Sequence, residues 1–230
     1  MSADGQSGDG QHKPASERVR VRRRPARADY DPAAAYRVLD EALLCHVGLV
    51  IEDFPHVMPM LHVRLDDTLY FHGAPANRAL GTLASGAPVS VTATLLDSLV
   101  LGRSAYENSV NYRSVMAFGQ ARPVVDEAVK RQVMTRLLTR LLPPERLDEV
   151  RPLSSRELSR TTVVGLVLAE SSVKARTGPA VDAREDLDAR VWAGEIPFTP
   201  GLGTPVPDGL GPWTVSVPES FKGWTGPPNL

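Results

Sequence analysis

The segment from His56 to Leu80, HVMPMLHVRLDDTLYFHGAPANRAL, restricts the fold more than any other part of the chain. Two runs of apolar and β-branched residues flank an Asp66-Asp67 turn, so the segment predicts an antiparallel hairpin. The second run ends in the small residues Gly73-Ala74-Pro75-Ala76, and a helical pattern begins at Asn77-Arg78. This combination is typical of a phosphate site, because backbone N–H groups at a helix start and a guanidinium can both face an anion.

The rest of the chain continues a β-dominated order of elements. Asp31 before Pro32 is a typical N-cap and first-turn pair for a helix. Because closure removes exposed edges, the antiparallel sheet is expected to close into a barrel within an α+β fold. We expect helices at 33–44, 78–84 and 126–142, and strands at 46–51, 57–65, 68–72, 89–96, 112–125 and 161–168.

Length, charge and cysteine content exclude several classes of protein. The 230 residues suffice for one core with tails, and a net charge of −1 gives no general reason to expect a nucleic-acid partner. No apolar run approaches the roughly 20 residues that span a bilayer, so no membrane partner is expected either. No signal peptide is recognisable, and Cys45 is the only cysteine, which is consistent with a reducing compartment. We therefore expect a cytoplasmic protein.

Both ends of the chain differ in composition from its middle. Residues 1–28 are polar and contain six arginines between Arg18 and Arg27. We interpret them as a disordered Arg-rich arm, with contact to nucleic acid or to an acidic partner as the alternative. Residues 197–230 contain eight prolines and six glycines, which predicts an extended tail. The folded domain is expected to comprise residues 29–196.

Five short motifs occur in a fixed order between Cys45 and Pro197: VMPMLHV, LYFHGAPANRAL, NYRSVMAFGQA, VKARTGP and VWAGEIP. In this order they resemble the FMN-binding split β-barrel superfamily of pyridoxamine 5′-phosphate oxidase. Within it, the chain is most similar to the nitroimidazole-resistance and flavin-nucleotide-binding branch. The resemblance implies an antiparallel split β-barrel (Greek key) with flanking helices and FMN as cofactor. It also implies a homodimer that reduces a small-molecule substrate, with NAD(P)H as a possible electron donor.

The resemblance also implies which residues contact FMN. Arg78 would hold the flavin phosphate, although a helix-surface arginine would look the same in the sequence. Asn77 would cap the helix or donate to the phosphate, and His72 would lie near the flavin or simply bond to the backbone at a strand end. The remaining implied contacts, to the ring, the ribityl chain or the phosphate loop, are Met58, Pro59, Met60, Gly73, Thr92, Tyr112, Arg113, Ser114, Lys174 and Trp192.

Two other classes of function share this barrel. A non-catalytic flavin-binding or flavin-storage protein would need the same phosphate anchor, and a haem- or deazaflavin-binding barrel would differ in its pocket. The arginine–histidine pattern that binds substrate in true pyridoxamine-phosphate oxidases is not recognisable near the C-terminus, so that substrate is not expected. The sequence also contains no convincing metal-ligand spacing, P-loop, GxGxxG or Ser-His-Asp order.

Overall fold

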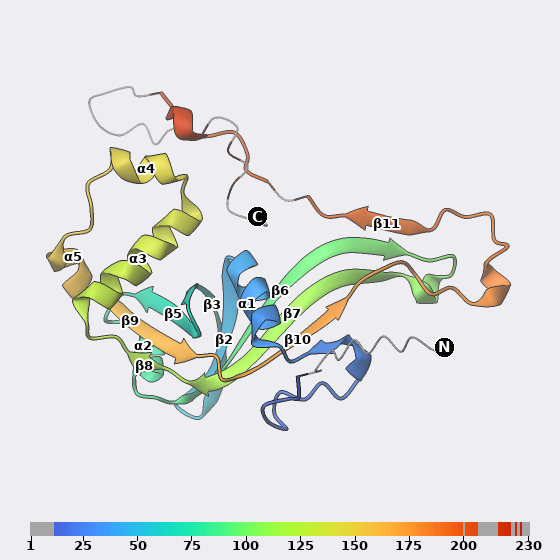
Figure 1. Cartoon of the computed structure of the whole chain (residues 1–230), viewed down its shortest axis with the longest axis horizontal. Coiled ribbons are helices and arrows are strands. Elements are labelled where there is room, and N and C mark those ends of the chain that lie inside the picture. The colour runs from blue at the N-terminus through green and yellow to red at the C-terminus, as the bar shows by residue number, and fades with distance from the viewer. Residues whose placement is uncertain (1–11, 200, 207–215, 222–223, 225, 227–230) are drawn as a thin grey trace, which may run out of the picture.

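The computed structural model describes residues 12–199, 201–206, 216–221, 224 and 226. These residues form two antiparallel sheets with helices at their margins, which confirms the predicted split-barrel α+β fold (Figure 1). The smaller sheet has the order β4 (Val63–Leu65), β5 (Thr68–Gly73), β9 (Thr162–Val167), β8 (Arg122–Pro123). The seven-stranded sheet has the order β1 (Ala28–Asp29), β10 (Glu170–Arg176), β7 (Ser109–Gln120), β6 (Pro88–Leu101), β2 (Leu44–Ile51), β3 (Phe54–Leu61). Its seventh strand, β11 (Gly194–Pro197), lies outside this order and pairs with β6.

The two sheets enclose the main hydrophobic core, and a second, smaller cluster contains Val63, Val133 and Val163. Along β2, the inward residues Cys45, Val47 and Leu49 are buried, while Leu44 and His46 are exposed on the other face. This alternation follows from the two-residue period of a strand. Helix α1 (Pro32–Glu41) and helix α2 (Arg78–Ala84) pack on the core. The buried members of the core include Val38, Leu39, Leu69, Phe71, Leu80, Leu83, Val91, Val115 and Leu166.

The strand predicted at 57–65 is divided in two at His62, which corrects the expectation. β3 belongs to the larger sheet and β4 to the smaller one, and His62 between them is only 1% exposed. The His62 Nε2 atom lies 2.8 Å from the carbonyl oxygen of Leu39. Arg140 donates to the carbonyls of His62 (2.8 Å), Leu39 (3.0 Å) and Ala42. This corner between the sheets therefore depends on contacts across 98 and 101 residues of sequence.

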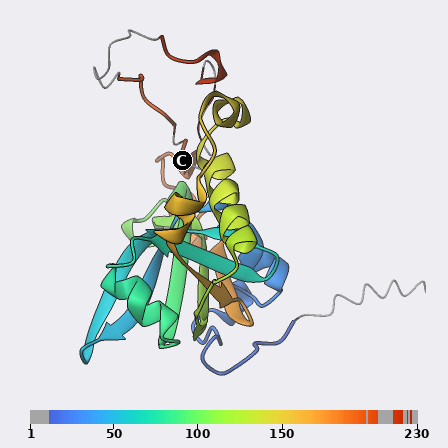
Figure 2. The same cartoon turned by 90° about the vertical axis from the view of Figure 1, so that its left-hand side faces the viewer.

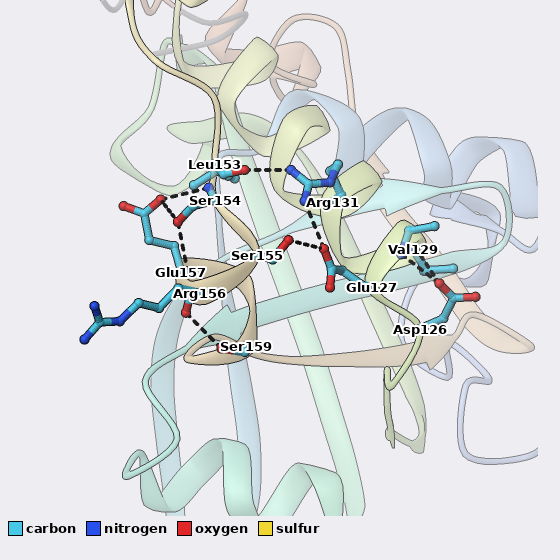
Figure 3. Close-up of polar contacts among 11 residues, drawn as sticks. Asp126, Glu127, Val129, Arg131, Leu153, Ser154, Ser155, Arg156, Glu157 and Ser159 are labelled. Atoms are coloured by element: carbon cyan, nitrogen blue, oxygen red, sulfur yellow. Dashed lines mark hydrogen bonds and ion pairs between the residues drawn. The ribbon is translucent and has the colours of Figure 1, made fainter.

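Three helices between β8 and β9 lie at one end of the barrel (Figures 1 and 2). They are α3 (Glu127–Leu141), α4 (Pro144–Glu149) and α5 (Ser155–Ser159), of which only α3 was predicted. Figure 3 shows how α5 is held against α3: Ser155 donates to Glu127 at 2.9 Å, and Arg131 donates to the carbonyl of Leu153 at 2.7 Å. Among the described helices, none is long and apolar enough to cross a membrane.

Part of the expected N-terminal arm, within residues 12–28, contacts the barrel in the structure. Val19 is buried, and the Ser16 hydroxyl donates to Glu170 of β10 at 2.9 Å. The Val21 N–H donates to the Tyr30 hydroxyl, also at 2.9 Å. One buried apolar side chain and pairing of β1 with β10 supply the contacts that the sequence pattern did not indicate. The remaining arm residues, 1–11, lie outside the described part.

The hairpin of β6 and β7 extends beyond the barrel, and the chain after β10 returns along it (Figure 1). Short 3₁₀ turns occur at Pro25–Arg27, Ala105–Glu107, Arg184–Asp186 and Glu219–Phe221. Two buried polar side chains hold the returning segment: Asn111 donates to Glu195 of β11 at 2.6 Å, and Ser98 donates to it at 3.2 Å. Of the expected tail, the Phe198 N–H still bonds to the Asp97 carbonyl at 3.0 Å, and residues 207–215 lie outside the described part.

Candidate functional site

The outer face of the larger sheet, which points away from the core, carries a row of side chains set by strand register. Pro59, His46, Thr92, Met116 and Ser172 are successive partners across β3, β2, β6, β7 and β10. Exposed apolar side chains surround this row on the same face, namely Leu44, Val50, Val57 (68% exposed), Leu96 and Met116 (46% exposed). A contiguous apolar area on a soluble protein is typical of a binding or interaction surface.

A groove of about 380 Å³ crosses the same face at one end of the row. Gly48 and Ser90 lie in its floor, and a Cβ atom at Gly48 would lie 2.6 Å from the Ser90 hydroxyl oxygen. Glycine at this position therefore leaves room for the Ser90 hydroxyl between β2 and β6. Arg18 of the N-terminal arm lines the groove, with its guanidinium carbon 5.9 Å from the centre of the Phe118 ring. The groove thus combines apolar walls with one cation.

Five of the predicted ring contacts belong to this outer face by their register: Pro59, Thr92, Tyr112, Ser114 and Lys174. The hydroxyl groups of Thr92 and Ser114 already have partners inside the chain. Thr92 donates to the Val115 carbonyl at 2.8 Å, and the Ser114 and Thr94 hydroxyls lie 3.0 Å apart. The face therefore offers a ligand apolar surface and the Lys174 ammonium, while the Thr92 and Ser114 hydroxyls are already bonded.

Three other predicted contacts are not on this face. Met58 and Met60 are half-buried and pack against the core, because they alternate with the outward Pro59. Arg113 belongs to the opposite, core-side parity of β7 and donates to Asp97 at 2.8 Å and to Glu41. Its hydrogen bonds to Asp97 are the main cause of a raised pKa of the guanidinium. Burial opposes this shift, and the hydrogen bond to Glu41 adds to it. The structure thus places these three side chains on the core side of their strands, and the Arg113 charge is already balanced within the chain.

The backbone of the predicted phosphate loop is formed as expected. However, the N–H groups and the guanidinium that would bind a phosphate already have partners within the chain. Asn77 is the N-cap of α2, and its side-chain oxygen accepts from the N–H groups of Ala79 at 3.0 Å and Leu80 at 3.2 Å. Arg78 is exposed and pairs with Glu52 of the β2–β3 turn at 3.4 Å. A phosphate at this helix start would therefore have to displace a carboxylate, and the exposed pair is weak enough to allow this.

Two predicted site residues at the end of the strand that leads into this loop also have structural roles. A Cβ atom at Gly73 would lie 2.8 Å from a Leu80 methyl carbon, so Gly73 allows α2 to pack on β5. His72 is half-buried opposite Val163, and burial lowers its pKa. Its imidazole is therefore expected to be neutral at pH 7.

The last predicted contact, Trp192, is exposed and lies against Gly194 at the start of β11. Figure 1 shows β11 and α2 on opposite sides of the structure. Within one copy, the segment that carries Trp192 is therefore far from the helix that begins at Arg78. Sequence reasoning also passed over His46 as a site residue. The alternation of His46 with the buried Val47 and Leu49 is the signal that could have placed it on the outer face.

The fold and the grooved, partly apolar outer face place the chain among the split-barrel proteins. Comparison with known proteins identifies its family. The chain belongs to the pyridoxamine 5′-phosphate oxidase family, which matches residues 31–175. The flavocytochrome Anf3 from Azotobacter vinelandii is 36% identical, with a TM-score of 0.81 over 93% of this chain and 99% of that one. A FAD and haem binding protein from Mycobacterium smegmatis is 30% identical, with a TM-score of 0.76 over 89% of this chain and 100% of that one.

A third solved structure shares the fold at lower identity. It is described as a 5-nitroimidazole antibiotic resistance protein from Bacteroides thetaiotaomicron and is 21% identical, with a TM-score of 0.53 over 64% of this chain and 86% of that one. No curated protein matches the chain. The predicted resemblance to the split-barrel superfamily is thus confirmed.

Proposed function

We propose that this protein is a flavin-binding split barrel that also binds haem, with both cofactors held against the outer face of the larger sheet. The exposed row of Pro59, His46, Thr92 and Met116, with the adjacent groove, is the observation that carries the proposal. Similarity to two solved proteins over nearly their whole length supports it, because one is called a flavocytochrome and the other a FAD and haem binding protein.

A second copy of the chain is the proposed cover for this face. In an isolated chain, the apolar side chains of Val57 and Met116 are exposed to water, where they contribute little to the stability of the fold. A two-fold dimer would place the outer faces of two copies against each other and enclose cofactors between them. The dimer would also be the means by which Trp192 of one copy approaches the phosphate loop of the other, since one copy keeps them apart.

The flavin phosphate is proposed to bind at Arg78. The guanidinium is exposed, and its partner Glu52 is equally accessible to solvent, so a doubly charged phosphate can replace the carboxylate. Our expectation from the sequence is FMN, and the phosphate that Arg78 would hold is common to FMN and FAD. When bound, a flavin supplies hydride and single-electron chemistry, and the protein supplies binding and electrostatics.

His46 would hold the haem iron in this proposal. It is exposed and lies in the row between Pro59 and Thr92, on the side of β2 that faces away from the core. His62 does not fit this role, because it is buried and bonded to the Leu39 carbonyl. Lys174 on the same face is a cation that could pair with a haem carboxylate, and Arg18 at the groove could do so by exchanging its present partner, Glu170.

The visible spectrum of the purified protein tests the proposed cofactors. We expect flavin bands together with a Soret band, and sedimentation of the same sample as a dimer. His46→Ala should lose the Soret band and keep the flavin, because the imidazole that would hold the iron is removed while the phosphate loop is intact. The comparison variant is His56→Ala, on the neighbouring strand opposite the inward Leu49; His56 lines the groove but is not in the row, so this variant should keep the Soret band.

A parent protein with no Soret band would refute haem binding. A Soret band that His56→Ala removes and His46→Ala retains would contradict the ligand assignment. A monomer that holds flavin tightly would contradict the proposed dimer.

Flavin affinity in Arg78→Ala tests the phosphate anchor. Loss of a charge-assisted pair worth roughly 1.5–3 kcal/mol should weaken flavin binding about tenfold to a hundredfold, as measured by fluorescence titration. Glu52→Gln is the informative control, because it frees the guanidinium and removes a competing negative charge. That variant should bind flavin at least as tightly as the parent, and unchanged affinity in Arg78→Ala would exclude Arg78 from the site.

Flavin-dependent reduction of a small molecule, in the cytoplasm and with NAD(P)H as donor, is the proposed activity. Its alternative is a flavin-storage protein, which would bind the same cofactor without being reduced. Stopped-flow mixing of the purified protein with NADH or NADPH distinguishes them, since bleaching of the flavin absorbance is expected only for the oxidoreductase.

A further inference from the structure

Apart from the outer-face groove, a polar pocket lies where the N-terminal arm meets the far end of the β6–β7 hairpin. β1 pairs antiparallel with β10, with Ala28 opposite Lys174, so the residues just before Ala28 run beside Arg176. The pocket has a volume of about 400 Å³. It is lined by Arg24, Arg27, Tyr106, Glu107, Asn108, Ser109, Arg176 and Val181.

The backbone of the arm is specifically shaped at this pocket. Arg24 has a φ of 54°, in the left-handed region that a residue with a branched or long side chain seldom adopts. The turn is closed by a hydrogen bond of 3.0 Å from the Arg27 N–H to the Arg24 carbonyl. This turn brings both arginines into the lining of the pocket, whereas Arg22 and Arg23 just before it do not line it.

The charge of the pocket favours an anion. Arg176 is only 8% exposed, and its guanidinium donates to neutral oxygens: Asn111, and the carbonyls of Gly178 at 2.8 Å and Pro179 at 3.0 Å. Among the described residues, neither Arg24 nor Arg27 has a carboxylate within ion-pair distance. Three guanidinium groups and a single carboxylate, that of Glu107, therefore line the site. A buried, uncompensated arginine is costly unless an anion pairs with it.

The remaining lining residues indicate which anion fits. Tyr106 is 90% exposed at the margin, so one face of its ring is available to stack on a planar base. Glu107 can accept hydrogen bonds from ribose hydroxyls or from an exocyclic amino group, and Ser109 adds a hydroxyl. Arginines arranged around one space can bind a diphosphate through several charge-assisted hydrogen bonds.

We propose that this pocket binds a nucleoside diphosphate group, either as a free nucleotide or as the ADP part of a larger cofactor. The diphosphate lies between Arg24, Arg27 and Arg176, and the base stacks on Tyr106. The site does not include Arg78, His46 or the outer-face groove. As a site for a free nucleotide it stands independently of the function proposed above, and as a site for the ADP part of FAD it rests on the proposed flavin binding.

Calorimetric titration of the purified full-length protein with ADP, at fixed low ionic strength, tests the site. The double variant Arg24→Gln/Arg27→Gln should weaken ADP binding by about tenfold or more, because two charge-assisted contacts are lost. The matched control Arg22→Gln/Arg23→Gln removes the same charge from the same arm outside the pocket and should bind ADP as the parent does. Tyr106→Ala should weaken ADP binding without changing the affinity for inorganic pyrophosphate.

The flavin released from the same purified proteins distinguishes the two sources of the nucleotide. If the ADP part of a bound FAD fills the pocket, added ADP will not bind the parent, and Arg24→Gln/Arg27→Gln will release less FAD relative to FMN. If the ligand is a free nucleotide, ADP will bind the flavin-loaded parent. The proposal is overturned if ADP does not bind and the FAD-to-FMN ratio is unchanged. It is also overturned if both arginine pairs weaken ADP binding equally.

Discussion

The free energy of unfolding is expected to fall by about 3 kcal/mol between about pH 7 and pH 4 because of His62 alone. Burial, partly offset by the hydrogen bond to the Leu39 carbonyl and aided by nearby Arg140, lowers the pKa of His62 to about 4. In the unfolded chain, this imidazole takes up a proton near its ordinary pKa of about 6.5. The unfolded state therefore binds more protons in this range, so stability is fully present above about pH 6.5 and is lost as the pH falls towards 4.

Urea unfolding at several pH values measures this effect, with His62→Gln as the comparison. The glutamine amide can still donate to the Leu39 carbonyl, but it does not titrate. The parent should be the more stable protein at neutral pH, and its advantage should shrink as the pH falls. The prediction fails if the parent and the variant lose stability with the same pH dependence, because the shift would then arise at other groups such as His72.

Replacement of Arg140 by alanine should lower the free energy of unfolding by about 3 kcal/mol. The guanidinium of Arg140 donates to the carbonyls of Leu39, Ala42 and His62, which belong to the end of α1 and to the corner between the sheets. Its removal leaves buried carbonyls without a donor, and each such group costs about 1–3 kcal/mol. For a domain of this size, we expect a melting temperature lower by about 6–12 °C.

Arg136→Ala is the matched control for this prediction. Arg136 lies one turn earlier on α3 and is exposed, and the same substitution there should change stability by no more than about 0.5 kcal/mol. Scanning calorimetry of both variants decides the matter. Equal melting temperatures for Arg140→Ala and Arg136→Ala would show that the three carbonyls are satisfied without Arg140.

The sequence by itself determined the elements whose signals are local. Asp31 caps α1 as predicted, with its carboxylate accepting from the Ala33 N–H at 2.9 Å. The predicted bounds of α2 at 78–84 match the structure, because Asn77 is a strong N-cap and Gly86 and Pro88 prevent continuation. The strands of the barrel were recognised from alternation and turn residues, and their order was enough to indicate the family.

Only the tertiary structure decided features that depend on distant partners. The strand β10 was not predicted, because Ser171 and Ser172 interrupt the apolar pattern, although both are buried in the folded chain, where β10 pairs with β7. Likewise, the sequence did not show that Glu41, 72 residues away, and Asp97 would balance the charge of Arg113. It also did not show that Arg24 and Arg27 would line one pocket with Arg176, which follows from the pairing of β1 with β10.

The physical reason for this division is the range of the interactions. Capping, turn formation and strand alternation involve residues a few positions apart, so their energies can be read from a short window of sequence. Burial and charge compensation depend on which residues meet after the chain has closed into a barrel. The pKa of His62, the hydrogen bonds of Arg140 and the environment of Arg176 all depend on such meetings. The sequence therefore determined the barrel, and only the folded chain decided which of its charged groups are already paired and which are available to a ligand.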